Sequence, residues 1–149
     1  MLSNAFRLTC LLGFALSGSD AARAAGPDVC VALPVATVNE LVHQSLTGTR
    51  SDVSEEAHSY GCAYGAAGRV SVSVIRPGGA AAFSRTSSRY PNAMTVAGLG
   101  DKAMHDKQAG TIAIFGDMAI DAFVPQGSMS DAEILAMEKA LILAARSKL

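Results

Sequence analysis

The chain has 149 residues, of which 50% are hydrophobic and 17% charged, and its 12 basic and 13 acidic residues give a formal net charge of −1. That length fits one domain, and the apolar fraction excludes an intrinsically disordered chain. The balanced charge argues against a nucleic acid or an anionic membrane surface as partner.

Residues 1–24 have the three-part pattern of a secretory signal peptide. Met1–Arg7 carries one positive charge, an apolar run extends to Leu16, and Ala22-Arg23-Ala24 is a small-x-small cleavage site. The run is far shorter than the roughly 20 residues that cross a bilayer, and no later segment reaches that length. A buried first helix is the alternative, which glycines inside the segment make unfavourable. We therefore expect cleavage between Ala24 and Ala25, leaving one domain over 25–149 without a membrane span.

Neither of the first two cysteines has the surroundings of a lipoprotein cleavage site. Cys10 lies within the predicted signal peptide, and Cys30 follows Asp28-Val29 rather than a small residue at the end of an apolar run. We therefore expect a soluble protein that is periplasmic or secreted.

Removal of the signal peptide leaves two cysteines, Cys30 and Cys62. An even pair in an oxidising compartment predicts a disulfide, whose loop closure would contribute roughly 3–4 kcal/mol to stability. A redox-active pair would need Cys-x-x-Cys spacing, and a metal site would need two further ligands near the thiols. Both patterns are missing, so the structural bridge is favoured.

The opening of the mature chain predicts one helix followed by a loop. Pro34–Leu46 places its apolar residues at helical spacing, and Gly48 supplies a stop. Thr37 and Glu40 have the spacing of a capping box. The polar stretch Thr49–Glu56 is predicted to be an exposed loop.

Two strands are predicted next. Tyr60, Cys62 and Tyr64 alternate with small or polar residues, which is typical of a strand with one buried face. Val70–Val74 shows the same alternation of valine with serine. Cys62 would point inward with the tyrosines and meet Cys30 at the start of the first helix, pinning that helix to the sheet.

The second half predicts a helix, a three-stranded meander and a closing helix. The middle helix is Ala80–Arg89, and the closing helix begins at a capping box of Ser130 and Glu133 and ends near Ser147. The predicted strands are Ala103–Asp106, Thr111–Phe115 and Met118–Val124, and the predicted turns are Gly65–Gly68, Pro77–Gly79, Gly98–Asp101, Gln108–Gly110 and Gly116-Asp117. Because strands joined by short turns pair antiparallel, the predicted class is α+β, with a sheet of about five antiparallel strands and N-terminal, middle and C-terminal helices packed on it.

No residue pattern marks a catalytic or metal site, and no cofactor is expected. His43, His58 and His105 are scattered without metal-ligand spacing, so each is interpreted as a solvated or hydrogen-bonded surface residue. The serines lack the sequence contexts of known nucleophile motifs. A hydrolase whose site assembles only on folding is the alternative, with Ser84, His58 and His105 among its candidate residues.

Three further features favour ordinary structural roles. Gly98-Leu99-Gly100 lacks the third glycine of a phosphate-binding turn, so it is interpreted as a bend with positive φ angles. Glu55-Glu56 is interpreted as a solvated face. Three arginines flank the predicted middle helix without the exposed aromatic residues of a nucleic-acid site: Arg76, Arg85 and Arg89.

Three aromatic residues would suit the wall of a ligand site. They are Tyr60, Tyr64 and Phe123, and all three lie in predicted strands. Strand periodicity assigns them to the core first, with the ligand wall as the alternative.

The chain resembles small bacterial envelope domains of unknown function, many of which are lipoproteins. The resemblance rests on Cys30 before a helix, on Gly61-Cys62-Ala63-Tyr64, on the Gly-Leu-Gly-Asp-x-Ala turn within Val96–Ala103, and on the closing helix. It implies an α+β fold with an antiparallel sheet and a bridge between Cys30 and Cys62, and it implies no catalytic residue. The absence of a lipoprotein cleavage site departs from the anchored members.

Together these features favour an exported, non-enzymatic binding module that acts through a protein surface or an apolar groove beside the sheet. The expected partner is an envelope protein or a small apolar ligand, with no nucleic acid. A narrower version is an inhibitor or immunity protein against an envelope-acting enzyme. The residues do not set an oligomeric state.

Overall fold

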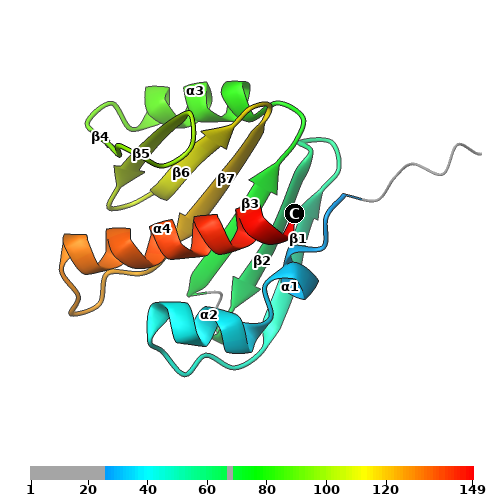
Figure 1. The fold of residues 1–149 in the computed structure, drawn as a ribbon, viewed down its shortest axis with the longest axis vertical. Helices are drawn as coiled ribbons and strands as arrows, with labels where there is room; N and C mark the ends of the chain where they lie inside the picture. The colour runs from blue at the N-terminus through cyan, green and yellow to red at the C-terminus, as the bar shows by residue number, and fades with distance from the viewer. Residues whose placement is uncertain (1–25, 67–68) are drawn as a thin grey trace, which may run out of the picture.

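The computed structural model describes residues 26–66 and 69–149 (Figure 1). The predicted signal peptide, its cleavage site at Ala24 and Ala25, and Cys10 lie outside the described residues, as does the second half of the predicted turn Gly65–Gly68. Within the described part, no helix is both long and apolar enough to cross a membrane.

Seven strands form one antiparallel sheet in the order β1-β2-β3-β7-β6-β5-β4. The strands are β1 (Thr49–Ser54), β2 (Ser59–Tyr64), β3 (Val70–Ile75), β4 (Met94–Thr95), β5 (Lys102–Asp106), β6 (Gly110–Phe115) and β7 (Met118–Phe123). The helices are α1 (Val29–Ala32), α2 (Val35–Val42), α3 (Gly79–Arg89) and α4 (Asp131–Lys148). This architecture confirms the predicted α+β class, with N-terminal, middle and C-terminal helices packed on an antiparallel sheet.

The alternating side chains of the strands divide the sheet into two faces. The main core lies on one face, where β3 contributes Val70, Val72 and Val74 and where α1, α2 and α4 pack. In Figure 1, α4 crosses in front of the sheet on this side. The other face carries α3, which buries a smaller cluster made of Ala82, Met104, Ile112 and Ala119.

The first edge strand, β1, occupies a segment that was predicted to be a loop. All six residues of Thr49–Ser54 are exposed, although each has a register partner on β2. Strand prediction depends on one buried face, and this edge strand has none. The loop prediction for Thr49–Glu56 is therefore wrong, and only the turn after Ser54 is irregular.

The helix predicted over Pro34–Leu46 forms only in part, as α2 over Val35–Val42, and the four-residue helix α1 that precedes it was not predicted. Pro34 lies between them as the N-cap of α2 and makes no side-chain hydrogen bond there. The capping box expected from Thr37 and Glu40 is therefore absent, since both residues lie inside the helix.

Helix α2 ends earlier than the stop expected at Gly48. It ends at His43, whose φ of 52° is left-handed. The side chain of Asn39 accepts a hydrogen bond from the Leu46 N–H at 2.9 Å and donates one to the Leu46 carbonyl at 3.0 Å. This two-way bond holds the chain in the turn that leads to β1.

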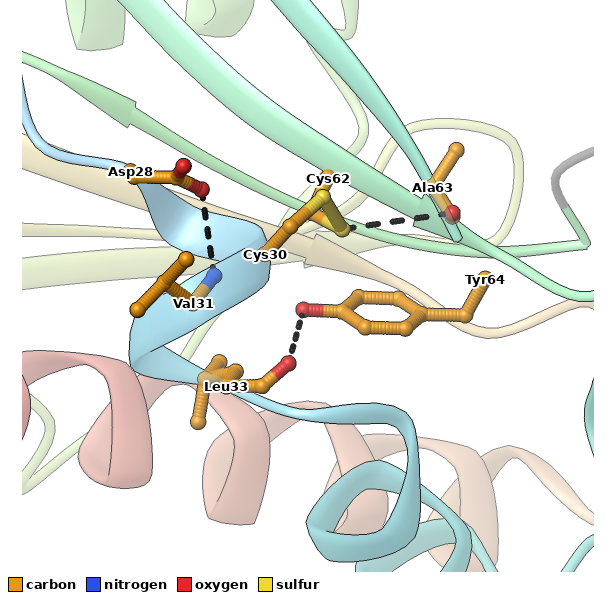
Figure 2. The surroundings of a disulfide bond; sticks show 7 residues. All are labelled: Asp28, Cys30, Val31, Leu33, Cys62, Ala63 and Tyr64. Carbon is orange, nitrogen blue, oxygen red and sulfur yellow. Dashed lines mark hydrogen bonds between the residues drawn. A yellow bond between two sulfur atoms is a disulfide. The ribbon is translucent and has the colours of Figure 1, made fainter. Parts of the chain in front are cut away.

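The predicted disulfide is confirmed, and it ties α1 to the sheet (Figure 2). Cys30 on α1 is joined to Cys62 on β2, with their Cα atoms 5.1 Å apart. Beside the bridge, the buried Tyr64 hydroxyl donates to the Leu33 carbonyl at 2.8 Å. The alternation of β2 therefore turns Cys62 and Tyr64 inward as predicted, and both attach the N-terminal helices to this strand.

The second half follows its predictions closely. The middle helix and the three meander strands lie within two residues of their expected bounds, and the capping box of Ser130 and Glu133 begins α4. The two-residue strand Met94–Thr95 was not predicted. It pairs with β5 as the second edge of the sheet.

Candidate functional site

A cleft of about 630 Å³ opens on the α3 face of the sheet. Its floor is formed by β2, β3 and β7, its wall by α3, and one end by the turn between β5 and β6. The floor carries Ser59, Ser71, Ser73, Asp121 and Phe123.

The alternation of two central strands builds this floor. In β3, the valines at every second position face the main core, so Ser71 and Ser73 face the cleft. In β7, Ile120 is buried in the main core and Asp121 points the opposite way. Because Ser73 and Asp121 are register partners, a hydroxyl and a carboxyl meet at the centre of the floor.

Asp121 is the most strongly perturbed group in the cleft. Burial raises the pKa of Asp121 to about 6, although a hydrogen bond from the Ser73 side chain acts in the opposite direction. No ion pair joins this carboxyl to a base in the part of the chain that the structure describes. An acid that changes charge near neutral pH on the floor of a cleft is typical of a functional site.

The wall of the cleft supplies positive charge. Arg85 and Arg89 are exposed, lie one helical turn apart on α3, and both line the cleft. The Arg89 guanidinium lies 5.9 Å from the centre of the Tyr90 ring, and neither arginine forms an ion pair with another described residue. Two guanidinium groups without carboxylate partners make this wall suited to an anion.

Replacing Asp121 with Asn is expected to stabilise the fold at pH 8 and to leave it unchanged at pH 3. The carboxyl titrates near 3.8 when unfolded and near 6 when folded, so the native state loses stability as the pH rises through that window. The wild-type penalty above pH 6 is about 2 kcal/mol after allowance for partial exposure, and Asn avoids it. Urea unfolding at both pH values measures the difference. Asp117→Asn, at an exposed turn position, is the control, and a destabilised Asp121→Asn variant at pH 8 would contradict the assignment.

A second polar cluster lies on the opposite face, between the sheet and α4. The carboxylate of Glu138, which is 1% exposed, accepts hydrogen bonds from the Thr111 hydroxyl at 2.6 Å and the Val124 N–H at 3.0 Å. Its Oε2 also lies 3.0 Å from Nδ1 of His105. Burial raises the pKa of Glu138, and these hydrogen bonds oppose the shift. Each partner holds α4 against the sheet, so the cluster is interpreted as a structural clamp.

The histidines and the candidate serine do not converge on one site. His105 is buried rather than on the surface as predicted, because Glu138 of α4 supplies a partner that lies far away in the sequence. His43 ends α2, and His58 lies in the β1–β2 turn with a φ of 51°. Ser84 is exposed on α3, across the sheet from His105.

The three aromatic candidates are divided between the two faces. Tyr64 is fully buried in the main core and Tyr60 packs against it, as predicted. Phe123 is half-buried and lines the cleft instead. Phe123 therefore departs from its core assignment, and the ligand wall that was the alternative is not formed by the three residues together.

The glycine bend is confirmed as a turn. Gly98 and Gly100 have φ values of 72° and 62°, and a Cβ atom on Gly100 would overlap the Ile114 carbonyl oxygen. The bend lines a separate cavity of about 440 Å³ beside α3. The described residues contain no group of three or more His, Cys, Asp or Glu side chains arranged to hold a metal ion.

Comparison of the chain with protein-family models, with curated proteins and with solved structures found no match.

Asp121 and Glu138 were not singled out from the sequence. Asp121 interrupts the apolar run of β7, and an acidic residue inside a strand of alanine, isoleucine and phenylalanine is a detectable signal. Glu138 has no such signal, because its helix contains several charged residues that are exposed.

Proposed function

We propose that the chain is an exported, non-enzymatic binding module whose ligand occupies the cleft between α3 and the sheet. One observation carries the proposal: the carboxyl of Asp121 and the guanidinium groups of Arg85 and Arg89 line the same 630 Å³ cleft. Cavities of about 300–1,000 Å³ are typical of small-molecule sites.

The lining favours a ligand that combines an anionic group with hydroxyl groups. The two arginines suit a carboxylate, because the guanidinium fork matches its two oxygens. Asp121 and the serines of the floor accept and donate hydrogen bonds to hydroxyls, and the Phe123 and Tyr90 rings offer apolar faces beside them. A sugar acid has all three features, so it is the ligand class that we assign.

The energetic cost of Asp121 supports a binding role. The half-buried carboxyl of Asp121, which has no ion pair, lowers stability at pH values above its pKa, and a serine or asparagine at this position would not. Groups that destabilise a fold yet line a cleft are typical of sites kept for function.

Export is supported by the disulfide, because such bridges persist in oxidising compartments. Mass spectrometry of the protein recovered after expression from the full coding sequence is expected to find a chain that starts at Ala25. A chain that retains Met1, recovered with reduced Cys30 and Cys62, would contradict export.

Isothermal titration with D-glucuronate is the test of the binding role. We expect saturable binding at pH 7.5 and no binding of D-glucose, which lacks the carboxylate. Arg85→Ala and Asp121→Asn should each weaken glucuronate binding about tenfold, as the loss of one charged hydrogen bond does. Lys102→Ala, an exposed cation on β5 outside the cleft, is the matched control.

Two outcomes would overturn this assignment. Absence of saturable glucuronate binding would rule out a sugar acid as the ligand. If Lys102→Ala weakened glucuronate binding as much as the cleft variants do, the effect would be one of general charge. Release of a product from a glucuronide by the wild-type protein, lost in Asp121→Asn, would replace the binding role with a catalytic one.

A further inference from the structure

We infer that the outer edge of β1 is a self-association surface, on which a second copy of this chain adds its own β1 in antiparallel orientation. β1 is the terminal strand of the sheet, and no described residue pairs with its outer side. All six of its residues are exposed. In Figure 1 the strand lies at the border of the sheet, beyond β2.

The backbone groups that face outward follow from one hydrogen bond at the start of the strand. The Gly65 N–H donates to the Gly48 carbonyl at 3.1 Å, one position before the first β1–β2 pair. Hydrogen-bonded and non-hydrogen-bonded pairs alternate in an antiparallel ladder, so the even-numbered residues of β1 point their backbone groups to β2. The outward N–H and C=O groups belong to Thr49, Ser51 and Val53.

The charges of β1 select one register for the second copy. In an antiparallel pair of β1 strands, a residue whose backbone groups point outward must lie opposite another such residue of the second copy. In each possible register, one central position of β1 therefore lies opposite the same position of the second copy. A register centred on Ser51 places Arg50 of each copy opposite Asp52 of the other, so two opposite-charge pairs form. A register centred on Arg50 or on Asp52 places like charges directly opposite each other, which is destabilising.

The register centred on Ser51 also pairs the longest stretch of strand. Ser51 faces Ser51, and Thr49 of each copy faces Val53 of the other, so as many as six backbone hydrogen bonds form. Val53 is 53% exposed in the single chain and loses part of that exposure in the pair. The complementary charges on the outer edge of β1 therefore favour pairing with the same edge of a second copy.

The arrangement has a geometric consequence. Two residues that lie opposite each other in an antiparallel pair have their side chains on the same face of the sheet. The two-fold axis that relates the two copies is therefore perpendicular to the sheet, and both α3 clefts open on the same side. Five strand spacings of about 4.8 Å separate the two β3 strands, which places the clefts about 25 Å apart. The association does not depend on which ligand the clefts bind.

Sedimentation velocity over a range of protein concentrations tests the inference. The wild-type protein is expected to show a monomer–dimer equilibrium that weakens with added salt. Arg50→Asp and Asp52→Arg should each weaken the dimer at least about tenfold, because each variant places like charges opposite each other. An equimolar mixture of the two variants should recover dimers, since both acidic side chains of one variant then face basic side chains of the other.

Recovery in the mixture separates a specific register from unfolding, because misfolded variants would not restore each other. Lys102→Asp and Asp117→Arg, which change exposed charges away from β1, are the matched controls and should leave the dimer unchanged. A wild-type protein that stays monomeric at every concentration overturns the inference. A dimer that is indifferent to both β1 variants overturns it as well.

Discussion

Replacing Cys30 with Ser is expected to lower the free energy of unfolding by about 3–4 kcal/mol and the melting temperature by roughly 10 °C. The bridge spans 32 positions of sequence, and its loss lets the unfolded chain explore many more conformations. The helix α1 that it holds has only four residues, too few to be stable alone. Thermal unfolding monitored by circular dichroism measures the shift.

The same experiment has an internal check. Val31→Ala changes a residue of α1 that is 73% exposed, so it should shift stability by less than about 0.5 kcal/mol. Thiol titration in denaturant should find one new free thiol in the Cys30→Ser variant, from Cys62. An unchanged melting temperature, or a wild-type protein whose melting does not respond to a reductant, would contradict the structural role of the bridge.

Replacing Glu138 with Ala is expected to cost about 3–5 kcal/mol, the range for removing one partner of a buried charged cluster. The change leaves the Val124 N–H without its acceptor and removes the carboxylate that Thr111 and His105 share, so these two side chains keep only their contact with each other at 3.0 Å. The clamp between α4 and the sheet is lost, and α4 shields much of the main core. Urea unfolding at pH 7 measures the loss.

Glu138→Gln separates the hydrogen bonds from the charge. The glutamine keeps one acceptor oxygen for Val124, and its amide can donate to Thr111 or to an unprotonated His105 nitrogen. We expect a loss of only about 1 kcal/mol from this variant. Glu40→Ala, an exposed acid on α2, is the control. Equal stability of the Ala variant and the wild type would contradict the clamp.

Much of the fold was predictable, because most elements have one buried side. The valines of β3 mark a strand whose second face is less buried, and the alternation of large and small residues around Cys62 marks β2. The capping box of Ser130 and Glu133 located the start of α4 because both of its hydrogen bonds are local. Signals of this kind are local, so they do not depend on the fold of the rest of the chain.

The two strands that were not predicted, β1 and β4, have no buried side. β1 is exposed at every position, so its only evidence as a strand is the backbone pairing with β2. Helix α1 was not predicted because its four residues are too few to show an apolar period, and the end of α2 depends on the hydrogen bonds between Asn39 and Leu46. These features depend on strand pairing and on hydrogen bonds, which the periodicity of apolar residues does not indicate.

The candidate site shows the same division. The arginines of α3 were recognised as flanking a helix, but their position above the floor of a cleft depends on how α3 packs on β6 and β7. Asp121 was overlooked because its strand was assigned by its apolar residues. His105 was placed on the surface because its partner on α4 lies 33 residues away in the sequence.

By itself, the sequence determined the class of the fold, the disulfide between Cys30 and Cys62, and the inward face of each central strand. These follow from composition, from cysteine number and from side-chain alternation, which are local or countable properties. Only the tertiary structure decided that Thr49–Ser54 is an edge strand, that Glu138 clamps α4, and that Asp121 shares a cleft with two arginines. Burial and charge pairing are properties of the packed chain, because they depend on neighbours that folding brings from distant positions.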